Sequence, residues 1–291
     1  MDTGRRTAMT ALLAAGLAPG TAAAAASRRP ADAGLVPGAA APASPARAVP
    51  AAGAGPRPPA ALLGAEIRRL PTSRKVVALT FNAAWDESGL DTVLGELRRR
   101  KLPATFFPTG DFADAHPAAV RAMGAAHGLG NHSYSHPYFN DLSTQERADE
   151  VGRADTAIRR ASGTEPLPFF RFPYSATSED AIADVNDLGY AAIEFTADTN
   201  GYLGPARGMT VDEAVRRAVD ALTPGAIIQM HVGSTGDGVV LDAQALPRII
   251  DAAQAAGYTV TDLRDFLTED PEIGMRAGQR VRRVDPRGTT H

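Results

Sequence analysis

The sequence predicts an α/β fold whose parallel strands either close into a barrel or wind into an open sheet. Short apolar runs rich in branched residues, such as KVVALTF at 75–81, are typical of strands buried on both faces. Segments with apolar residues at helical spacing follow most of these runs. About seven such strands, most of them followed by a helix, favour a parallel sheet.

The strands and helices are expected to alternate from residue 75 onward. The first strand precedes a helix that carries Leu90, Val93, Leu94 and Leu97 at helical spacing. Further strands are expected at 104–107, 129–132, 169–172, 190–195, 226–230 and 259–263. Further helices are expected at 114–126, 143–161 and 211–222, with one more before the last strand.

Several helix ends carry their own signals. Ser143 with Glu146, and Thr210 with Glu213, have the spacing of capping boxes at helix starts. Gly257 is typical of the residue at which a helix ends, here the helix before the last strand.

The chain outside this alternation has a different composition. Residues 1–26 combine Arg5 and Arg6 with a short apolar stretch and small residues, which is typical of a secretory signal peptide and leaves Sec and Tat export both open. Residues 27–65 are rich in Pro and Ala and predict a disordered linker. The working domain is expected at 66–270, followed by a basic flexible tail at 271–291. A secreted or cell-wall-associated protein follows from these predictions.

Composition limits the chemistry and the partners. The 291 residues include no cysteine, so any metal must bind His, Asp or Glu and no thiolate can act as nucleophile. A formal net charge of −3 with mixed signs provides no basic stripe for nucleic acid. No repeat or coiled coil indicates a dedicated protein partner.

Polar residues gather where the predicted strands end. His132, His136, Arg171, Asp198 and His231 all follow apolar runs. Because the carboxyl ends of barrel strands converge on one mouth, these side chains are expected to meet there. No Gly-x-Gly-x-x-Gly follows the first strand, so the sequence does not favour a dinucleotide-binding fold.

His132 and His136 are close enough in sequence to bind one metal ion, and two imidazoles suit a cation such as Zn²⁺. The same pair can instead be surface or capping histidines, since His-x-x-x-His often arises by chance. Each of the other three residues also has a structural interpretation. Arg171 can be a surface arginine beside a rigid turn, Asp198 a loop cap, and His231 a core histidine.

Five segments at the strand ends, taken in order, resemble the motifs of one family. They are TFNAAW at 80–85, HSYSH at 132–136, RFPY at 171–174, DTNGY at 198–202 and IQMH at 228–231. Their order and spacing are similar to the five motifs of the polysaccharide deacetylases, the NodB-homology domain of carbohydrate esterase family four. The resemblance spans residues 76–267.

This resemblance implies a distorted (β/α)7-type barrel that removes acetyl groups from N-acetylated sugars, in peptidoglycan or a chitin-like polymer. A divalent metal, usually Zn²⁺, would activate water, with His132 and His136 as ligands. Arg171 would orient the group at the end of the first strand, and the Tyr174 backbone N–H would help hold the oxyanion.

The resemblance also implies the partners of the proton donor. Asp198 would position and charge His231, and His231 would protonate the leaving amine as general acid. Hydrolysis of an amide needs such a proton on nitrogen, in addition to an activated water and a polarised carbonyl.

The first motif departs from the family pattern, which is normally Thr-Phe-Asp-Asp, with a base and then a metal ligand. Asn82 and Ala83 stand there in this chain. An amide cannot accept a proton at neutral pH, so Asn82 can orient water or offer its carbonyl oxygen to a metal but cannot act as the base. Asp86 or Glu87, just beyond Trp85, can swing in as ligand or base. Asp86 is the candidate third metal ligand, and it can equally cap the helix that follows.

The segments expected to bind substrate are altered too. Gly201 and Tyr202 stand where the fourth motif often has a second Asp and a Trp, and Trp85 can supply the missing aromatic wall. Gln229 replaces a leucine that would line the acetyl pocket. The candidate substrate-binding residues are Tyr174, Trp85, Tyr202 and Met230.

Three functions are consistent with these residues. The first is an exported, metal-dependent hydrolase that removes N-acetyl groups from polysaccharide. The second is a catalytically impaired protein of the same fold that binds glycan, and Asn82 is the residue that separates it from the first. The third is an O-acetyl esterase, for which a better leaving group makes a weak base more tolerable.

Overall fold

The computed structural model describes residues 57–234 and 238–267. The predicted signal peptide, the predicted linker up to residue 56 and the predicted tail lie outside these described residues. The end of the predicted linker, 57–65, is packed instead. Leu62 is buried in a core cluster with Leu70, and the Gly64 backbone N–H donates to Asn186 Oδ1 over 2.7 Å. The folded domain therefore begins before the predicted boundary at residue 66, because Leu62 contributes apolar area to the core.

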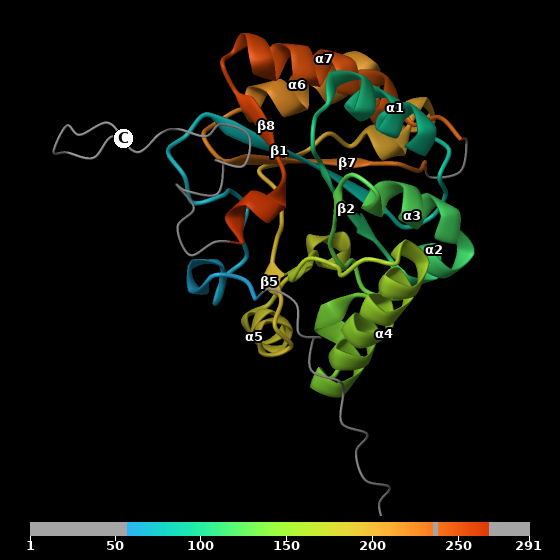
Figure 1. Cartoon of the computed structure of the whole chain (residues 1–291), viewed down its shortest axis with the longest axis vertical. Helices are drawn as coiled ribbons and strands as arrows, with labels where there is room; N and C mark the ends of the chain where they lie inside the picture. The colour runs from blue at the N-terminus through green and yellow to red at the C-terminus, as the bar shows by residue number, and fades with distance from the viewer. Residues whose placement is uncertain (1–56, 235–237, 268–291) are drawn as a thin grey trace, which may run out of the picture. The chain divides into compact units, whose positions relative to one another are not determined.

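The central sheet is parallel and is built around strand β1 (Val76–Ala83), which runs through the middle of the fold (Figure 1). Strand β1 is buried along its whole length, as expected for a strand covered on both faces. The strand order is β3-β2-β1-β7-β6, and β8 pairs with the first residues of β1. The other strands of this sheet are β2 (Thr105–Pro108), β3 (Gly128–Leu129), β6 (Ala197–Asp198), β7 (Ala226–His231) and β8 (Thr259–Thr261).

A second, two-stranded parallel sheet continues the arrangement. It consists of β4 (Phe169–Phe170) and β5 (Ala191–Ala192), and single bridges connect it to the chain after β3 and toward β7. The bridges pair Asn131 with Phe170, Ile67 with Ile193, and Arg69 with Ala226. The predicted α/β fold is confirmed, and the strands follow the course of a distorted barrel without a continuous ladder of hydrogen bonds around it.

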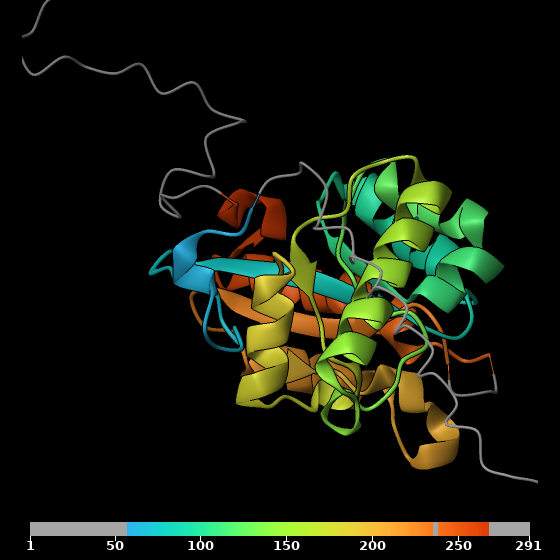
Figure 2. The same ribbon diagram turned by 90° about the horizontal axis from the view of Figure 1, so that it is seen from below.

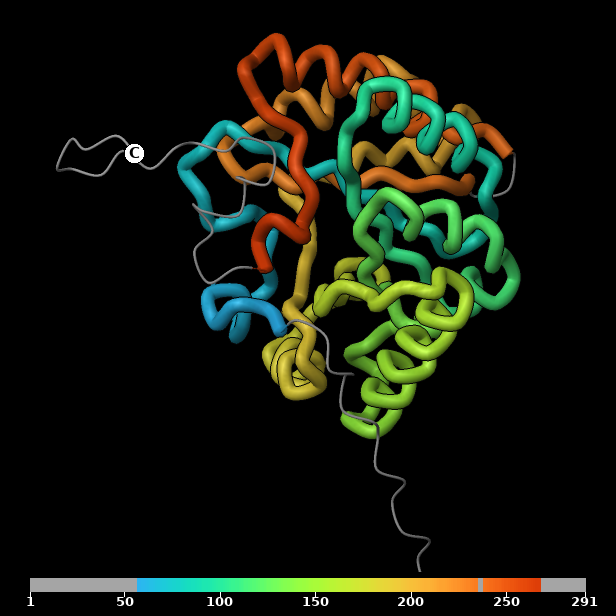
Figure 3. Tube along the Cα trace, in the orientation of Figure 1, coloured from blue at the N-terminus to red at the C-terminus, as the bar shows by residue number. Residues whose placement is uncertain are grey.

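Helices surround the strands in two groups. Helix α7 contacts α1 and α6, whereas α4 contacts α2, α3 and α5. In the tube view α7 lies beside α1 and α6 (Figure 3), and the ribbon seen from below shows α4 beside α2 and α3 (Figure 2). The helices are α1 (Leu90–Arg100), α2 (Gly110–Ala115), α3 (Pro117–Gly124), α4 (Thr144–Ser162), α5 (Glu179–Asp187), α6 (Val211–Asp220) and α7 (Leu241–Ala255). Short 3-10 turns lie at Ala60–Leu62, Phe139–Asp141, Pro173–Ser175, Gly201–Leu203, Pro205–Arg207 and Leu263–Phe266. No helix in the described part of the chain combines the length and the apolar character needed to cross a bilayer.

Some predicted elements differ from the observed ones. The helix predicted at 114–126 is two helices, because Pro117 lacks a backbone N–H and instead occupies the first position of α3. Helix α5 was not predicted, and the strand predicted at 190–195 is shortened to β5. The capping box of Ser143 and Glu146 at α4 is confirmed.

Candidate active site

The sheet register brings the predicted polar residues to one edge of the strands. Asn82 in β1 lies beside His231 in β7, and Asp198 in β6 lies beside Gln229. Arg171, which follows β4, donates from Nη1 to Asn82 Oδ1 over 3.0 Å. These strands are parallel, so the contacts lie at their carboxyl ends, where the sequence predicts the mouth.

The two histidines of the second motif lie side by side in this mouth. The ring centroids of His132 and His136 are 4.8 Å apart, with an interplanar angle of 79°. Burial, with His136 close by, holds the pKa of His132 well below its ordinary value. Burial, with His231 close by, lowers the pKa of His136 to about 4. Both imidazoles are therefore neutral near pH 7 and can offer lone pairs.

The backbone fixes the orientation of His132. Its Nδ1 lies 2.8 Å from the carbonyl oxygen of Arg171. A carbonyl oxygen only accepts hydrogen bonds, so Nδ1 carries the proton and Nε2 carries the lone pair. A metal-binding histidine is commonly oriented by such a bond.

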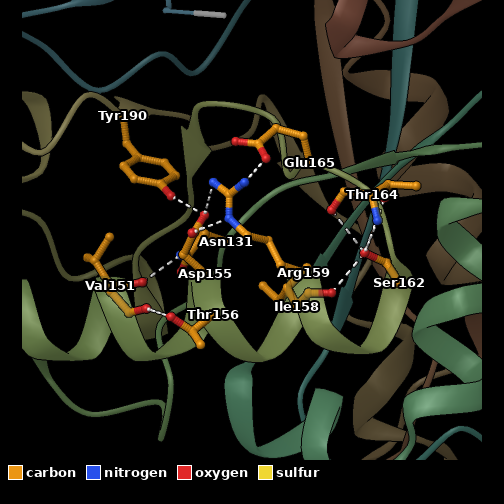
Figure 4. Close-up of polar contacts among 11 residues, drawn as sticks. Asn131, Val151, Asp155, Thr156, Ile158, Arg159, Ser162, Thr164, Glu165 and Tyr190 are labelled. Carbon is orange, nitrogen blue, oxygen red and sulfur yellow. Dashed lines mark hydrogen bonds and ion pairs between the residues drawn. The ribbon is translucent and has the colours of Figure 1, made fainter. Parts of the chain in front are cut away.

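The segment 131–136, here called the histidine loop, is held at its start by a contact between Asn131 and helix α4 (Figure 4). Asn131 donates from Nδ2 to the Val151 carbonyl over 3.0 Å, and its Oδ1 accepts from the Ser133 backbone N–H over 2.9 Å. One turn further along α4, the Asp155 carboxylate accepts from Tyr190 Oη over 2.6 Å. These bonds tie the loop and the segment before β5 to the same helix.

Glu150 of α4 supports the middle of the same loop. Its Oε2 accepts from the backbone N–H groups of Tyr134 and Ser135 at 2.9 and 2.8 Å. The loop needs such support because Ser133 and His136 have φ angles of 66° and 61°, a left-handed conformation that is costly for residues other than glycine.

Asp86 does not join the histidine pair. Its carboxylate accepts from the backbone N–H groups of Ser88 and Ser234 over 2.9 and 3.0 Å. Asp86 thereby caps the turn before α1 and ties it to the loop after β7. Across residues 57–234 and 238–267, no three His, Asp or Glu side chains are placed to hold a metal ion. The predicted ligand set of His132, His136 and Asp86 is therefore not assembled.

The donors present fit part of a metal site. Catalytic zinc sites commonly use three protein ligands and an open position, and His132 and His136 supply two. Ala83 is buried and has no donor atom, and the carbonyl oxygen of Asn82 accepts from Arg171.

A chain of hydrogen bonds crosses the floor of the mouth. After the bond from Arg171, Asn82 Nδ2 donates to Gln229 Oε1 over 3.2 Å. Gln229 Nε2 then donates to Asp198 Oδ2 over 2.8 Å. The two amides thus link a guanidinium to a carboxylate, and the Asn82 side chain has both its oxygen and its nitrogen engaged.

Arg171 is fully buried at the start of this chain. Burial lowers its pKa to about 10, with Glu194 and Asp198 opposing the shift, so it remains a cation at neutral pH. Burial also raises the pKa of Glu194, whose Oε1 accepts from the Phe172 backbone N–H over 3.1 Å. Glu194 is absent from the predicted site residues, although an acid inside the apolar run at 190–195 was a usable signal.

The predicted pairing of Asp198 with His231 is not formed. The Asp198 carboxylate accepts from Gln229 and from the Asn200 backbone N–H, the latter over 2.8 Å. A different carboxylate lies against His231. Asp242, in the first turn of α7, accepts from the His231 backbone N–H over 2.9 Å. No sequence pattern indicated where this acid points.

Trp85 covers the mouth and is 46% exposed. Its ring centroid lies 5.9 Å from that of His136, 6.2 Å from that of His231 and 6.0 Å from that of Tyr202. One indole therefore reaches two of the three imidazoles, and the predicted aromatic wall of Trp85 and Tyr202 is present.

Tyr174 extends this aromatic rim on the side of the histidine pair. Its ring lies 4.6 Å from that of His136 and stacks on Tyr138 at 4.0 Å, a contact that sequence reasoning missed. The prediction that Met230 lines the site is wrong, because Met230 is buried in the main core with Ile228. Side chains alternate along β7, so Met230 faces away from the side that carries His231.

Comparisons with known proteins agree with this geometry. Residues 69–193 match the family model described as polysaccharide deacetylase. The chain is 31% identical over 197 residues to a chitooligosaccharide deacetylase of Bradyrhizobium sp. (strain ANU 289), covering 64% of this chain and 88% of that protein. It is 26% identical over 203 residues to a peptidoglycan-N-acetylglucosamine deacetylase of Bacillus cereus, covering 69% of this chain and 72% of that protein.

Among solved structures, the chain is similar to a carbohydrate esterase family 4 pseudoenzyme of Bacillus anthracis. The TM-score is 0.63 at 26% identity, over 71% of this chain and 70% of that one. A mutant of that pseudoenzyme, described as having restored enzymatic activity, matches with the same TM-score at 27% identity, over 71% of this chain and 72% of that one. From the sequence match, the family model and the fold together, this chain belongs to the polysaccharide deacetylase family.

Proposed function

We propose that this protein removes N-acetyl groups from a polysaccharide of the chitin or peptidoglycan type, more slowly than relatives that carry carboxylates in the first motif. The named activities of its relatives support the substrate class. The observation that carries the proposal is the convergence of three imidazoles and a buried arginine under an exposed indole.

The exposed aromatic side chains support a sugar-binding mouth. Only four large apolar or aromatic residues of the described chain are strongly exposed, and three of them, Trp85, Tyr138 and Tyr174, lie on the rim of the site. Exposed aromatic clusters commonly mark binding surfaces, because each ring offers a large apolar face at low entropic cost. The aromatic faces are expected to contact the apolar faces of sugar rings.

The residues of the mouth can supply some of the groups that hydrolysis of an amide needs, but not all of them. A divalent ion such as Zn²⁺, when held by His132 and His136, would supply an activated water and a polarised carbonyl. Arg171 keeps Asn82 in place, and His231 would give a proton to the leaving nitrogen. The amide of Asn82 cannot take a proton from water, and the loss of a general base typically lowers a rate by about 10²–10⁴-fold.

A second candidate is a glycan-binding protein without turnover. It is favoured by the amide of Asn82, whose two polar atoms are both engaged, and by the missing third ligand among the described residues. The similarity to a pseudoenzyme supports the same interpretation.

Acetate release separates these candidates. The native protein, His132→Ala and Asn82→Asp are incubated with N-acetylated chito-oligosaccharide and peptidoglycan, with Zn²⁺ or Co²⁺ and with a chelator. Slow release by the native protein, abolished by His132→Ala and by chelator, is the expected result. Binding of the oligosaccharide without release, and release gained only in Asn82→Asp, would support the second candidate.

The same proteins are also incubated with an O-acetylated sugar. Release confined to O-acetyl groups would contradict both candidates and indicate an esterase. Failure to bind either sugar would refute a glycan function for this mouth.

A further inference from the structure

His231 has an unsatisfied nitrogen on its inner side. The residue ends β7 and is 5% exposed, and its Nδ1 is buried without a hydrogen-bond partner among the described residues. Buried polar atoms without partners are uncommon and costly, so each asks for an explanation. The carboxylate expected to satisfy Nδ1, that of Asp198, is engaged with Gln229 and Asn200.

Asp242 is the carboxylate that faces this nitrogen. It is fully buried in the first turn of α7, and its Oδ2 lies 3.7 Å from His231 Nδ1. The same Oδ2 accepts from the His231 backbone N–H over 2.9 Å, and Oδ1 accepts from Thr199 Oγ1 over 2.5 Å. A movement of roughly half an ångström would bring Nδ1 into the usual hydrogen-bond range.

The neighbouring backbone is shaped around this carboxylate. A Cβ atom on Gly201 would lie 2.1 Å from Asp242 Oδ1, which no side chain can tolerate without displacing the acid. Gly201 is the residue that stands where the resemblance leads one to expect a second Asp. The space that an acid on this loop would occupy is thus taken by an acid from α7.

We propose that Asp242 is the positioning residue of His231, in the role that the resemblance assigns to Asp198. Asp242 keeps a proton on Nδ1, so that Nε2 is the nitrogen that exchanges protons with a bound substrate. The pairing itself does not depend on the function, whereas its catalytic use rests on the proposed function. In that use the Nε2–H proton passes to the leaving nitrogen as the carbon–nitrogen bond breaks, and the ring is left neutral with its proton on Nδ1.

Nitrogen NMR of the labelled imidazole tests the pairing without any substrate. At pH 8 the chemical shifts of Nδ1 and Nε2 show which nitrogen carries the proton. The native protein and the matched control Asp198→Asn are expected to hold it on Nδ1. Asp242→Asn is expected to lose this preference while the melting curve shows a folded protein.

Gly201→Ala provides a second perturbation that leaves every charge in place. Its new Cβ should displace the Asp242 carboxylate and cause the same loss of preference at His231. If Asp242→Asn does not fold, Gly201→Ala and the native spectrum decide the question. A native protein with its proton on Nε2, or a loss caused by Asp198→Asn rather than by either change near Asp242, would overturn the proposal.

Acetate release then tests the catalytic use separately. In any background with measurable activity, Asp242→Asn is expected to lower kcat by about 10–100-fold with little change in KM, as is common for residues that orient a functional histidine. If the NMR result holds while no background releases acetate, the pairing stands and the proposed function fails.

Discussion

Replacing Asn82 by Asp should restore a base only in part, because Gln229 is matched to the amide. Asn82 Nδ2 donates to Gln229 Oε1 over 3.2 Å, and an aspartate oxygen in its place would face that carbonyl oxygen without a proton between them. If the Gln229 amide turns over, its oxygen faces Asp198 Oδ2, the present acceptor at 2.8 Å. Either arrangement leaves a buried polar group unsatisfied, which costs about 1–3 kcal/mol.

A double-mutant cycle measures how strongly positions 82 and 229 depend on each other. Its four proteins are the native protein, Asn82→Asp, Gln229→Leu and the double variant. Gln229→Leu alone leaves Asn82 Nδ2 and Asp198 Oδ2 without this partner, at a cost of about 1–3 kcal/mol. In the double variant the new aspartate keeps its bond to Arg171, now with a full charge, and neither the stranded amide donor nor the opposed glutamine oxygen remains. One aspartate oxygen and Asp198 Oδ2 still lack a donor, so two unsatisfied groups remain where the two single changes together create four. The double variant should therefore be about 1–3 kcal/mol more stable than the sum of the single changes predicts.

Thermal and denaturant unfolding of these four proteins measures the coupling directly. For a domain of this size, each kcal/mol corresponds to roughly 2–4 °C in Tm. The rate of acetate release should be higher for the double variant than for Asn82→Asp alone. A general base typically adds about 10²–10⁴-fold to a rate, so the gain should not exceed that range. Additivity of the four stabilities within about 0.5 kcal/mol, with equal rates for Asn82→Asp and the double variant, would refute the reasoning.

Three further predictions concern other parts of the mouth. Burial raises the pKa of Glu194, so the folded state retains this proton as pH rises above the ordinary value of 4.5 and stability falls. The neutral variant Glu194→Gln should have the same Tm as the native protein near pH 4 and an increasingly higher Tm as pH rises. A constant difference in Tm between the two proteins across this pH range would contradict the prediction. Asn131→Ala should cost about 1–3 kcal/mol in urea unfolding by stranding the buried Ser133 N–H, whereas the exposed control Gln145→Ala should cost less than about 0.5. Trp85→Ala should weaken calorimetric binding of N-acetylated chito-oligosaccharide by about tenfold or more, with the exposed Leu63→Ala unchanged, and equal affinities would exclude Trp85 from the sugar site.

The sequence was sufficient for elements whose signals are local. All eight residues of β1 are buried, and the strand opens with the apolar run Val76 to Leu79. The start of α4 is set by Ser143 and Glu146, three positions apart. Strands β4 and β5 lie inside the strands predicted at 169–172 and 190–195, but each is only two residues long. Where these strands end depends on pairing with distant segments, which a single sequence does not show.

The same distinction applies to the site. Strand ends predicted which residues meet, because parallel register carries Asn82, Asp198 and His231 to one edge. Side-chain partners were not predictable, because the sequence alone does not show that Asp198 pairs with Gln229 while Asp242 lies against His231. The error at Met230 was avoidable, because alternation along β7 already separates it from His231.

The polar groups on the floor of the mouth are hydrogen-bonded although position 82 carries no charge. At position 82 an amide accepts from Arg171 as a carboxylate would, and its second polar atom is satisfied by Gln229, so the shape of the floor does not require an acid there. Two acids lie next to this amide chain and His231: Asp198 at the far end of the chain, and Asp242 behind His231. Neither faces the histidine pair, where an activated water would have to lose its proton. Under the proposed function, the side of the mouth that would donate a proton has Asp242 and His231, whereas no carboxylate stands at position 82 to accept one. We therefore expect this protein to bind N-acetylated sugar and to release acetate slowly.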